Sequence, residues 1–360
     1  MIDTDLLDEH FPHRPSGYFD HAAVGTAPQE VEEAVARIAR ALSKGTRGGS
    51  EWRPLAEETA SMLGSEFGGD AERTIVLANT STAFIAASRA IPFSGHDEIL
   101  VFDDDFPTPR VSWRGITSAR VRSVKVAAGQ DRTSAMLEAV DRRTRVISTT
   151  HVHASTGEVT DLQRLSEAIH AQDGLLVTDG AQAAGLLSGG ALFADVYVGA
   201  SYKWLLGGFG SAVVCTSARF DEQARPQLIG YANTPPSSRL DVGHSNPFAL
   251  ASLSAASRVR QRIGLEEIRV HTLDLASRIS SAATALGFAL AVDRPESGIV
   301  SLRVPDAARK VAQLADHGLT ASVRDGAVRL SPYVTTTEAD MENLLHALAL
   351  IAGSTTVSRD

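Results

Sequence analysis

Two apolar segments of the 360-residue chain each lead to a charged residue, and the two charged residues could do chemistry together. The first segment is Leu175–Asp179, and the second leads to Lys203. Apolar runs of this kind indicate buried strands, and the carboxyl ends of parallel strands meet at one edge of a sheet. Since Asp and Lys are seldom buried without a partner, we expect both side chains to face one site.

This pair of residue types indicates pyridoxal phosphate as the cofactor. A lysine forms the Schiff base, and a carboxylate holds the pyridinium nitrogen protonated so that the ring accepts electrons from the substrate's Cα. Lys203 must be unprotonated to attack the aldehyde, and partial burial shifts the pKa of an amine in that direction. Two plainer alternatives stay open, namely a lysine that reaches the surface and, for Asp179, a helix cap.

A phosphate-binding turn is expected at Asn79–Ala83, where a strand ends and a helix begins. Ser81 and Thr82 supply hydroxyl groups there, and the backbone N–H groups point to where an anion could sit. Ser201, two residues before the lysine, could add a third hydroxyl. Ordinary helix capping is the alternative for this turn.

Alternating strands and helices must position these residues. Strands are expected at 74–79, 98–103, 121–126, 145–150, 175–179, 195–199 and 211–216, and helices at 29–44, 52–67, 81–90, 110–116, 132–140 and 161–172. Such alternation predicts an α/β fold with a large, mainly parallel seven-stranded sheet.

The pattern changes after about residue 220. A long helix at 247–263, strands near 299–304 and 327–331, and a final helix at 337–351 predict a smaller α+β unit. We therefore expect an irregular N-terminal arm (1–17), a large cofactor-binding domain (18–235) and a small C-terminal domain (236–360).

Composition limits the classes of function. The net charge is −9 without a basic cluster, which argues against nucleic-acid binding. No apolar run approaches the roughly 18 residues of a membrane span, and the first residues lack the order of a signal peptide, so we expect a cytoplasmic protein. The single cysteine, Cys215, excludes an internal disulfide and fits a reducing compartment.

Over nearly its whole length the chain resembles a fold-type I pyridoxal-phosphate enzyme of the class V aminotransferase family. The resemblance is carried by Tyr18–Ala23, Asn79–Ala83, Thr156–Glu158, Asp179–Gln182, Ser201–Trp204, Gly243–Asn246 and Val328–Pro332. It implies the aspartate aminotransferase-like fold, pyridoxal 5'-phosphate as the cofactor, and a homodimer with a shared active site. The family includes cysteine desulfurases, selenocysteine and other C–S lyases, isopenicillin N epimerase-like proteins and kynureninase.

The resemblance also implies roles for individual residues. Lys203 is the Schiff-base lysine and proton shuttle, Asp179 pairs with the ring nitrogen, and Gln182 supports the phenolate oxygen. The remaining cofactor contacts are Ser81, Thr82 and Ser201 at the phosphate, Phe106 stacked on the ring where many members have His, and His244 reaching the phosphate of a partner subunit. Arg329 binds the α-carboxylate of the substrate, because a guanidinium fork suits a planar anion.

Several positions depart from the family pattern. The stretch 319–328 lacks the cysteine that desulfurases need, so persulfide chemistry is not expected. Ala154 stands where many members carry Asn, and His151 and His153 on either side are candidates for substrate contact or acid–base catalysis, with structural histidines as the alternative. Arg47 is a candidate for substrate binding, with a solvated arginine as the alternative. No metal site is expected, because the two histidines lack a third ligand at suitable spacing.

The reaction expected first is β-elimination from an amino acid, of the C–S lyase type. It proceeds through an external aldimine and removal of the Cα proton by Lys203. A class V aminotransferase or an amino-acid epimerase would use the same cofactor residues, so both alternatives stay open. A non-enzymatic cofactor-binding regulator is disfavoured, because the chain has no DNA-binding appendage.

Overall fold

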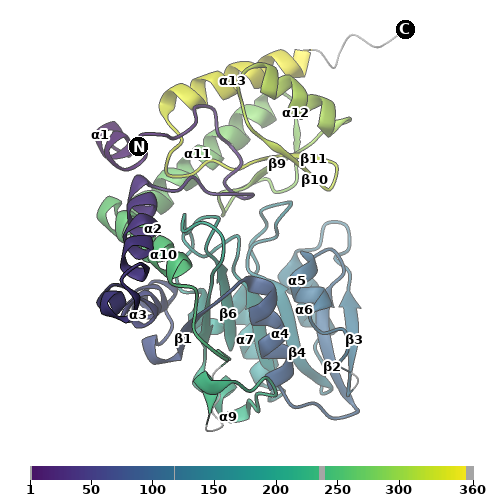
Figure 1. The fold of residues 1–360 in the computed structure, drawn as a ribbon. Coiled ribbons are helices and arrows are strands. Elements are labelled where there is room, and N and C mark those ends of the chain that lie inside the picture. Colours follow the sequence, from purple (N-terminus) through teal and green to yellow (C-terminus); the bar gives the residue numbers. More distant parts are fainter. Residues whose placement is uncertain (1, 117, 235–239, 354–360) are drawn as a thin grey trace.

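The computed structural model describes residues 2–116, 118–234 and 240–353, and two β-sheets of different size organise it (Figure 1). The large sheet contains seven strands in the order β1-β7-β6-β5-β4-β2-β3. Their bounds are β1 Thr74–Leu77, β2 Asp97–Phe102, β3 Ala119–Val124, β4 Thr144–Thr150, β5 Leu175–Asp179, β6 Val196–Ala200 and β7 Ala212–Thr216. Strands β6, β5, β4, β2 and β3 are parallel, whereas β7 runs antiparallel to both of its neighbours. The predicted mainly parallel, seven-stranded sheet is therefore confirmed.

Helices cover both faces of the large sheet, which explains why its central strands β5 and β6 are buried along their whole length, whereas the edge strand β3 is partly exposed and carries two arginines. One face packs on α3 (Leu55–Phe67), α6 (Arg132–Ala139) and α7 (Leu162–His170), and the other on α4 (Thr80–Ala90) and α9 (Ala218–Gln223). The remaining elements of this part are α5 Pro107–Val111, α8 Gly190–Phe193 and the short helices η1 Gly45–Glu51, η2 Ala71–Arg73 and η3 Tyr231–Asn233. The helix expected at 110–116 begins earlier, because Pro107 suits the first turn of a helix, and it also ends earlier, at Val111.

The small sheet has the order β10-β11-β9-β8, and all its pairings are antiparallel. Its strands are β8 Ala289–Leu290, β9 Val300–Arg303, β10 Ser322–Arg324 and β11 Ala327–Leu330. One face packs on α11 (Leu265–Ala285), α12 (Ala307–Asp316) and α13 (Glu338–Gly353), as Figure 1 shows. The other face is directed toward the large sheet.

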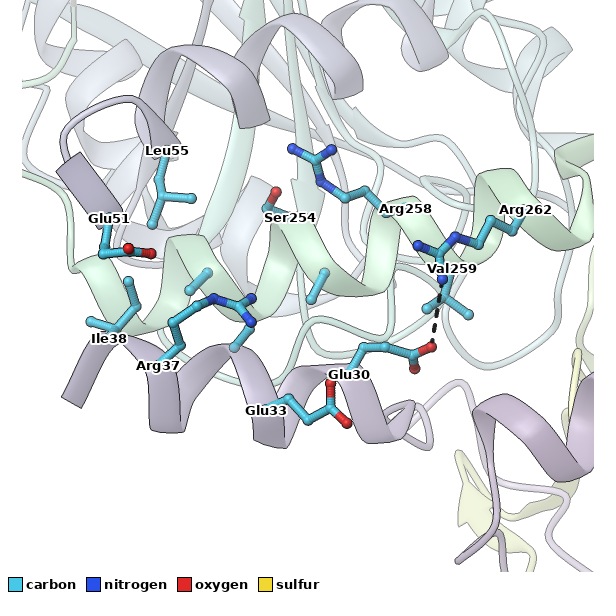
Figure 2. Close-up of a pocket in the computed structure, with 13 residues that line it drawn as sticks. Glu30, Glu33, Arg37, Ile38, Glu51, Leu55, Ser254, Arg258, Val259 and Arg262 are labelled. Carbon is cyan, nitrogen blue, oxygen red and sulfur yellow. Dashed lines mark ion pairs between the residues drawn. The ribbon is translucent and has the colours of Figure 1, made fainter. Parts of the chain in front are cut away.

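Helix α10 (Pro247–Ile263) has the bounds that its sequence predicts, with Asn246 as cap and Pro247 in the first turn. It packs against α2 (Gln29–Leu42) and α3, and a groove of about 340 Å³ lies between these helices (Figure 2). Charged side chains line the groove, among them Glu30 and Arg262, which form an ion pair of 3.9 Å. None of the predicted site residues lines it.

The N-terminal arm contains a helix, α1 (Thr4–His10), where an irregular segment was expected. Asp3 caps it, and Leu7 and Phe11 are buried in a cluster with Trp204, so tertiary packing stabilises a helix that its polar sequence does not predict.

The predicted boundary between 235 and 236 lies outside the described residues, and the division into domains stays a prediction. Among the residues that the structure describes, no helix is both long and apolar enough to span a membrane.

Candidate active site

A pocket lies where β4 and β5 end and where the chain turns after β6. Strand pairing sets Thr150, the last residue of β4, beside Asp179, the last residue of β5. The pocket is lined by Thr80, Phe106, Thr150, Val152, Ala154, Asp179, Ala181, Gln182, Tyr202 and Lys203. The sheet therefore brings Asp179 and Lys203 together at the carboxyl edge, where ligands of open α/β sheets bind.

The Lys203 side chain is buried, with 7% of its surface exposed. Burial lowers the pKa of its amine to about 8, against the opposing effect of the Asp179 carboxylate. Within the described residues, no hydrogen bond or ion pair engages this amine; its neighbours are the rings of Phe106 and Tyr202, each with its centroid 5.6 Å from Nζ. A buried amine that loses its proton readily and has no fixed partner can act as a nucleophile and as a base.

Asp179 is also buried, and burial raises the pKa of its carboxyl group to about 6. Its Oδ1 atom accepts a hydrogen bond of 2.8 Å from the backbone N–H of Ala181. No described residue donates a hydrogen bond to Oδ2. The carboxylate therefore combines a fixed orientation with an acceptor that can still receive a proton or an N–H group.

The amide of Gln182 is held on both sides. Its Nε2 donates to the carbonyl oxygen of Ala22 at 3.0 Å, and its Oε1 accepts from Nε1 of Trp204 at 2.9 Å. One hydrogen of the NH₂ group remains for a ligand in the pocket. This arrangement is compatible with the predicted contact to an oxygen atom of the cofactor.

The first turn of α4 borders the pocket through Thr80, which is not among the site residues predicted from the sequence. Asn79 caps the helix, and its Oδ1 accepts from both N and Oγ1 of Thr82, at 2.8 and 3.0 Å. Ser81 Oγ lies 3.3 Å from Oγ1 of Thr108. Backbone N–H groups in the first turn of a helix lack intrahelical partners, so those of Thr80 and Ser81 can bind an anion.

Ser201 and His244 contact protein groups instead of the pocket. The Ser201 hydroxyl lies 2.6 Å from the carbonyl oxygens of both Gly208 and Ser211, so its one proton is committed to the glycine-rich turn. His244 is exposed and borders a neighbouring cavity that Thr82 also lines. A contact of either residue with phosphate stays a prediction; Ser201 has no free donor for it in this arrangement.

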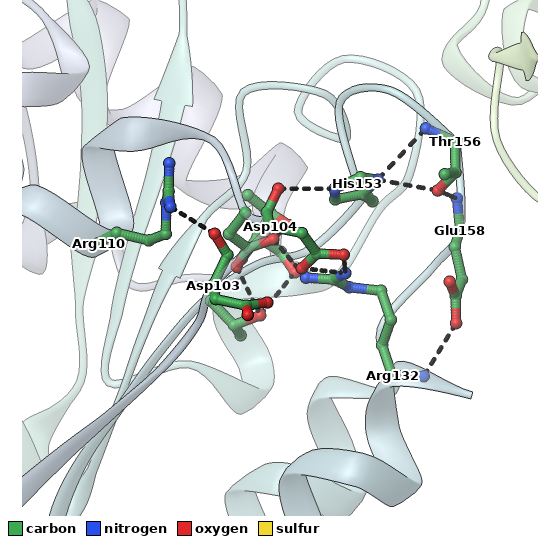
Figure 3. Close-up of polar contacts among 10 residues, drawn as sticks. Asp103, Asp104, Arg110, Arg132, His153, Thr156 and Glu158 are labelled. Carbon is green, nitrogen blue, oxygen red and sulfur yellow. Dashed lines mark hydrogen bonds and ion pairs between the residues drawn. The ribbon is translucent and has the colours of Figure 1, made fainter. Parts of the chain in front are cut away.

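Phe106 forms one wall of the pocket and has 46% of its surface exposed. The residue before it, Asp105, is buried and accepts hydrogen bonds from Nη2 of Arg132 at 2.6 Å and from Oγ1 and N of Thr150 at 2.7 and 3.0 Å. Figure 3 shows Arg132 reaching from the start of α6 to Asp104, with which it forms a second ion pair. The network joins the loop that carries Phe106 to the end of β4.

The structure does not bring His151 or His153 to Lys203. Side chains alternate along a strand, and Thr150 and Val152 line the pocket, so the histidines point away from it. His151 contacts the hydroxyl of Tyr197 at 3.2 Å, and burial lowers its pKa to about 4. His153 Nδ1 contacts Thr156, and Nε2 contacts the carbonyl oxygen of Asp104 (Figure 3). Their catalytic role stays an untested prediction, and this geometry matches the alternative of structural histidines.

Arg329 lies on β11, and its Nη1 donates to the carbonyl oxygen of Ala154, a residue that lines the pocket, at 2.8 Å. Its Nη2 pairs with Asp20 at 3.1 Å, and burial lowers the pKa of the guanidinium group. Arg47 is exposed on η1 and does not line the pocket. Neither arginine is among the residues that line the pocket; Arg329 hydrogen-bonds to Ala154, which does line it, and the substrate-binding role of both arginines stays a prediction.

Asp104, Asp105 and His153 offer ligand atoms within 4.8 Å of one another. The guanidinium of Arg132 already pairs with both carboxylates, however, and both ring nitrogens of His153 contact protein atoms. A cation would have to displace these partners, so the cluster is best described as an ion-pair network.

Comparisons with known proteins found a matching family model and related sequences. The family model described as "Aminotransferase class-V" matches residues 17–344. Kynureninase from Deinococcus radiodurans is 28% identical over 344 residues, covering 85% of this chain and 82% of that protein. A probable cysteine desulfurase from Methanothermobacter thermautotrophicus is 22% identical over 352 residues, covering 90% and 86%.

A solved structure is similar over almost the whole chain. It is a mutant of C-DES, in which a lysine is replaced by alanine and glycine is covalently linked to the PLP cofactor, with a TM-score of 0.86 and 20% identity. The match covers 95% of this chain and 98% of that one. At this level of identity the similarity establishes the fold, and the site is argued from the residues above.

Proposed function

Since the chain belongs to the aminotransferase class V family, we propose that it is a pyridoxal-phosphate lyase that eliminates a sulfur leaving group from Cβ of an amino acid. Pyridoxal phosphate is the cofactor of the enzymes in this family, and an active enzyme of this chain requires it. The reaction is the part that we propose. It follows from which groups in the pocket can carry a proton and which cannot.

The pocket fits this cofactor. The buried amine of Lys203 has no partner within the described residues, Oδ2 of Asp179 is free among the same residues, and the start of α4 presents backbone N–H groups. Lys203 would hold the aldehyde carbon, Asp179 the ring nitrogen, and Thr80 and Ser81 the phosphate. When bound, the cofactor supplies a conjugated ring that withdraws electrons from the Cα of the substrate.

The observation that carries the proposal is that Lys203 is the only amine or imidazole among the described residues that line the pocket. Lys203 therefore takes the Cα proton. Phe106, where many relatives have His, cannot donate a proton to a leaving group. The leaving group departs as a thiolate when the Cβ–S bond breaks and sulfur keeps the electron pair; Lys203, which has taken the Cα proton, and the phenol of Tyr202 are the groups in the lining that can then return a proton to it. Hydrolysis completes the reaction to pyruvate and ammonia.

The chain offers no thiol for the desulfurase reaction. The stretch before Arg329 forms the hairpin of β10 and β11, closed by Asp325 and Gly326, and it contains no cysteine. Cys215 lies buried on β7, where burial raises the pKa of its thiol to about 11. A thiol with so little thiolate at neutral pH is a poor nucleophile. The sulfur atom on Cβ of the substrate must therefore leave together with the substituent that it already carries, as a thiolate.

Three other reactions remain candidates for specific reasons. Transamination needs only Lys203 to carry the proton from Cα to the cofactor. Epimerisation by two opposed bases is less favoured, because Phe106 has no proton to give. Cleavage of kynurenine, the substrate that the name of the relative from Deinococcus radiodurans indicates, is the second candidate because the similarity covers most of both chains.

Assembly and location are also proposals. We expect a homodimer in which the Gly243–Asn246 segment of one subunit contributes to the other subunit's site. Apolar side chains near this segment are exposed in the single chain, including Ile229, Tyr231 and Phe248. Exposed apolar groups that gather in one region suit a protein interface. We also propose that the enzyme is cytoplasmic.

Pyruvate formation tests the proposed reaction. The reconstituted enzyme is given a panel of S-substituted cysteines, and release of pyruvate and thiol in equal amounts is expected. Kynurenine and several keto acids are included in the same panel. Formation of anthranilate, or keto-acid-dependent turnover without pyruvate, would overturn the elimination in favour of the corresponding alternative. Lys203→Ala is the control, because it removes the proposed base and should release none of these products.

A further inference from the structure

The face of the small sheet that looks toward the large domain is polar. Along β9 and β11 the side chains of Val300, Leu302, Val328 and Leu330 enter the core that α11, α12 and α13 cover, and Val323 of β10 packs against it. Side chains alternate along a strand, so residues 301, 303, 327 and 329 point to the opposite face. This polar face contains Ser301, Arg303, Ser322, Arg324, Ala327 and Arg329.

Strand register places three of its arginines close together. Ala327 is paired with Arg303 of β9 on one side and with Arg324 of β10 on the other, and directly opposed residues of antiparallel strands share a face. Arg329 lies two residues beyond Ala327 on the same strand. Arg303 and Arg324 therefore flank the strand whose Arg329 hydrogen-bonds to Ala154 in the lining of the active-site pocket.

The three arginines differ in their partners. Arg329 is paired with Asp20 and with the carbonyl oxygen of Ala154. Arg324 donates only to the carbonyl oxygen of its neighbour Val323, and Arg303 has no partner in the part of the chain that the structure describes. Two guanidinium groups on this face are thus available for an anion.

A cavity of about 610 Å³ opens in front of them. Arg303 and Arg324 line it on the side of the small sheet, and Asp104, His153 and Ser155 line it on the side of the large domain. Ser155 directly follows Ala154, which lines the pocket of Lys203, so the two spaces are neighbours. A substrate held at its α-carboxylate by Arg329 can extend its side chain into this cavity.

The geometry points to a subsite for an acidic side chain: we propose that Arg303 and Arg324 bind a second anionic group, such as a carboxylate, at the far end of the substrate. The inference rests on the proposed function and deepens it, because it specifies the substrate as an amino acid with an anionic substituent. The planar forks of two arginines match a carboxylate in both charge and shape.

The charges around the cavity are compatible with this subsite. Its acidic members are Asp104, which Arg132 neutralises, and Asp325 at the tip of the hairpin. Two free arginines face that one carboxylate, so the local balance is positive. Burial has the largest effect on the pKa values of Arg329 and Lys203, and the positive charge of Arg324 lowers both of them further. The charge of Arg324 therefore acts on the two residues that would hold the reacting end of the substrate.

A pair of ligands that differ only in charge tests the subsite. S-(2-carboxyethyl)cysteine and its neutral amide are mixed with the cofactor-loaded enzyme in a stopped-flow instrument, and the concentration dependence of the first change in the cofactor's absorption, before product forms, gives a Kd for each. We expect the acid to bind about ten-fold more tightly at low salt, as for a charge-assisted hydrogen bond near the surface. The preference should disappear in the Arg303→Gln, Arg324→Gln double variant while the Kd of the amide stays unchanged.

Arg309→Gln is the matched control, because this exposed arginine lies on α12, behind the apolar face of the sheet. It should keep the full preference for the acid. Equal binding of acid and amide by the wild-type enzyme would overturn the subsite alone, as would loss of the preference in the control. Failure of the loaded enzyme to bind either ligand would overturn the proposed function and the subsite with it.

Discussion

The carboxylate of Asp105 lies 2.6 Å from Nη2 of Arg132, and both side chains are buried beside the active-site pocket. Asp105 also accepts hydrogen bonds from the hydroxyl and the backbone N–H of Thr150, which lines that pocket. Phe106, the next residue, forms another part of its lining. The ion pair therefore connects two walls of the site to α6.

Replacing Arg132 by Met should destabilise the protein strongly. The substitution leaves the Asp105 carboxylate buried without its cationic partner, and breaking a buried pair in this way costs about 3–5 kcal/mol. Thermal unfolding of the cofactor-free protein measures the effect. The matched control is Arg258→Met, which removes an exposed pair with Glu58 and should cost less than about 1 kcal/mol. Equal shifts in the two variants would show that the Asp105–Arg132 pair is not a structural anchor.

Cofactor uptake should depend on pH through the amine of Lys203. Only the neutral amine attacks an aldehyde, and burial lowers its pKa to about 8, so roughly a tenth is reactive at pH 7. The rate of Schiff-base formation should rise with pH and level off above about 8. Stopped-flow absorbance of the cofactor-free protein mixed with pyridoxal phosphate follows it.

Asp179→Asn provides a matched comparison for that profile. The Asp179 carboxylate favours the charged amine, so its removal should move the midpoint to a lower pH. A midpoint near the ordinary lysine value of 10.5 in the wild-type protein would contradict the burial of Lys203. A midpoint that moves upward in the variant would contradict its proximity to Asp179.

Turnover should depend on Asp179 more than cofactor binding does. Asparagine has nearly the same shape but carries no charge with which to stabilise a protonated ring nitrogen. We expect Asp179→Asn to bind the cofactor and to lose at least about 100-fold in kcat, the range seen when one preorganised electrostatic contact is removed. Absorbance and steady-state assays on the same preparation separate the two effects. Undiminished kcat would refute the assigned role.

Arg329 should matter only for substrates that have an α-carboxylate. Its guanidinium already bonds to Ala154 and Asp20 at the edge of the pocket, and a lysine cannot reproduce a bidentate contact. We expect Arg329→Lys to raise KM about 10-fold or more for an S-substituted cysteine. Binding of the corresponding S-substituted cysteamine, which lacks the carboxylate, should hardly change. A similar loss for both ligands would indicate a structural role instead.

Much of the fold could be predicted because local signals agree with the tertiary structure. The central strands β5 and β6 of the large sheet are buried on both faces, and α10 has a cap, a first-turn proline and a closing glycine. The antiparallel direction of β7 could not be predicted, because the apolar pattern of a buried strand is the same whether the strand runs parallel or antiparallel to its neighbours. Helix α1 was missed, since its stability comes from Leu7 and Phe11 packing against residues far away in sequence.

The site was predictable where strands end and less so where loops begin. Lys203 and Asp179 follow or end buried strands, whose carboxyl ends must meet at one edge of the sheet. The direction of His153 and Ser201 depends on turns after the strands, and neither turn has a sequence pattern that fixes it. Thr80 is not among the predicted residues, although its position gives a signal: it is the first residue after the helix cap Asn79, where backbone N–H groups are free to bind an anion.

The identity of the nucleophile is the central claim, and borohydride reduction tests it most directly. Protein loaded with pyridoxal phosphate is reduced, digested and analysed by mass spectrometry, with Lys203→Ala treated in parallel. We predict one modified peptide, carrying the cofactor on Lys203, and none in the variant. Protein that stays colourless with added cofactor, or a modification at another lysine that persists in the variant, would contradict the account.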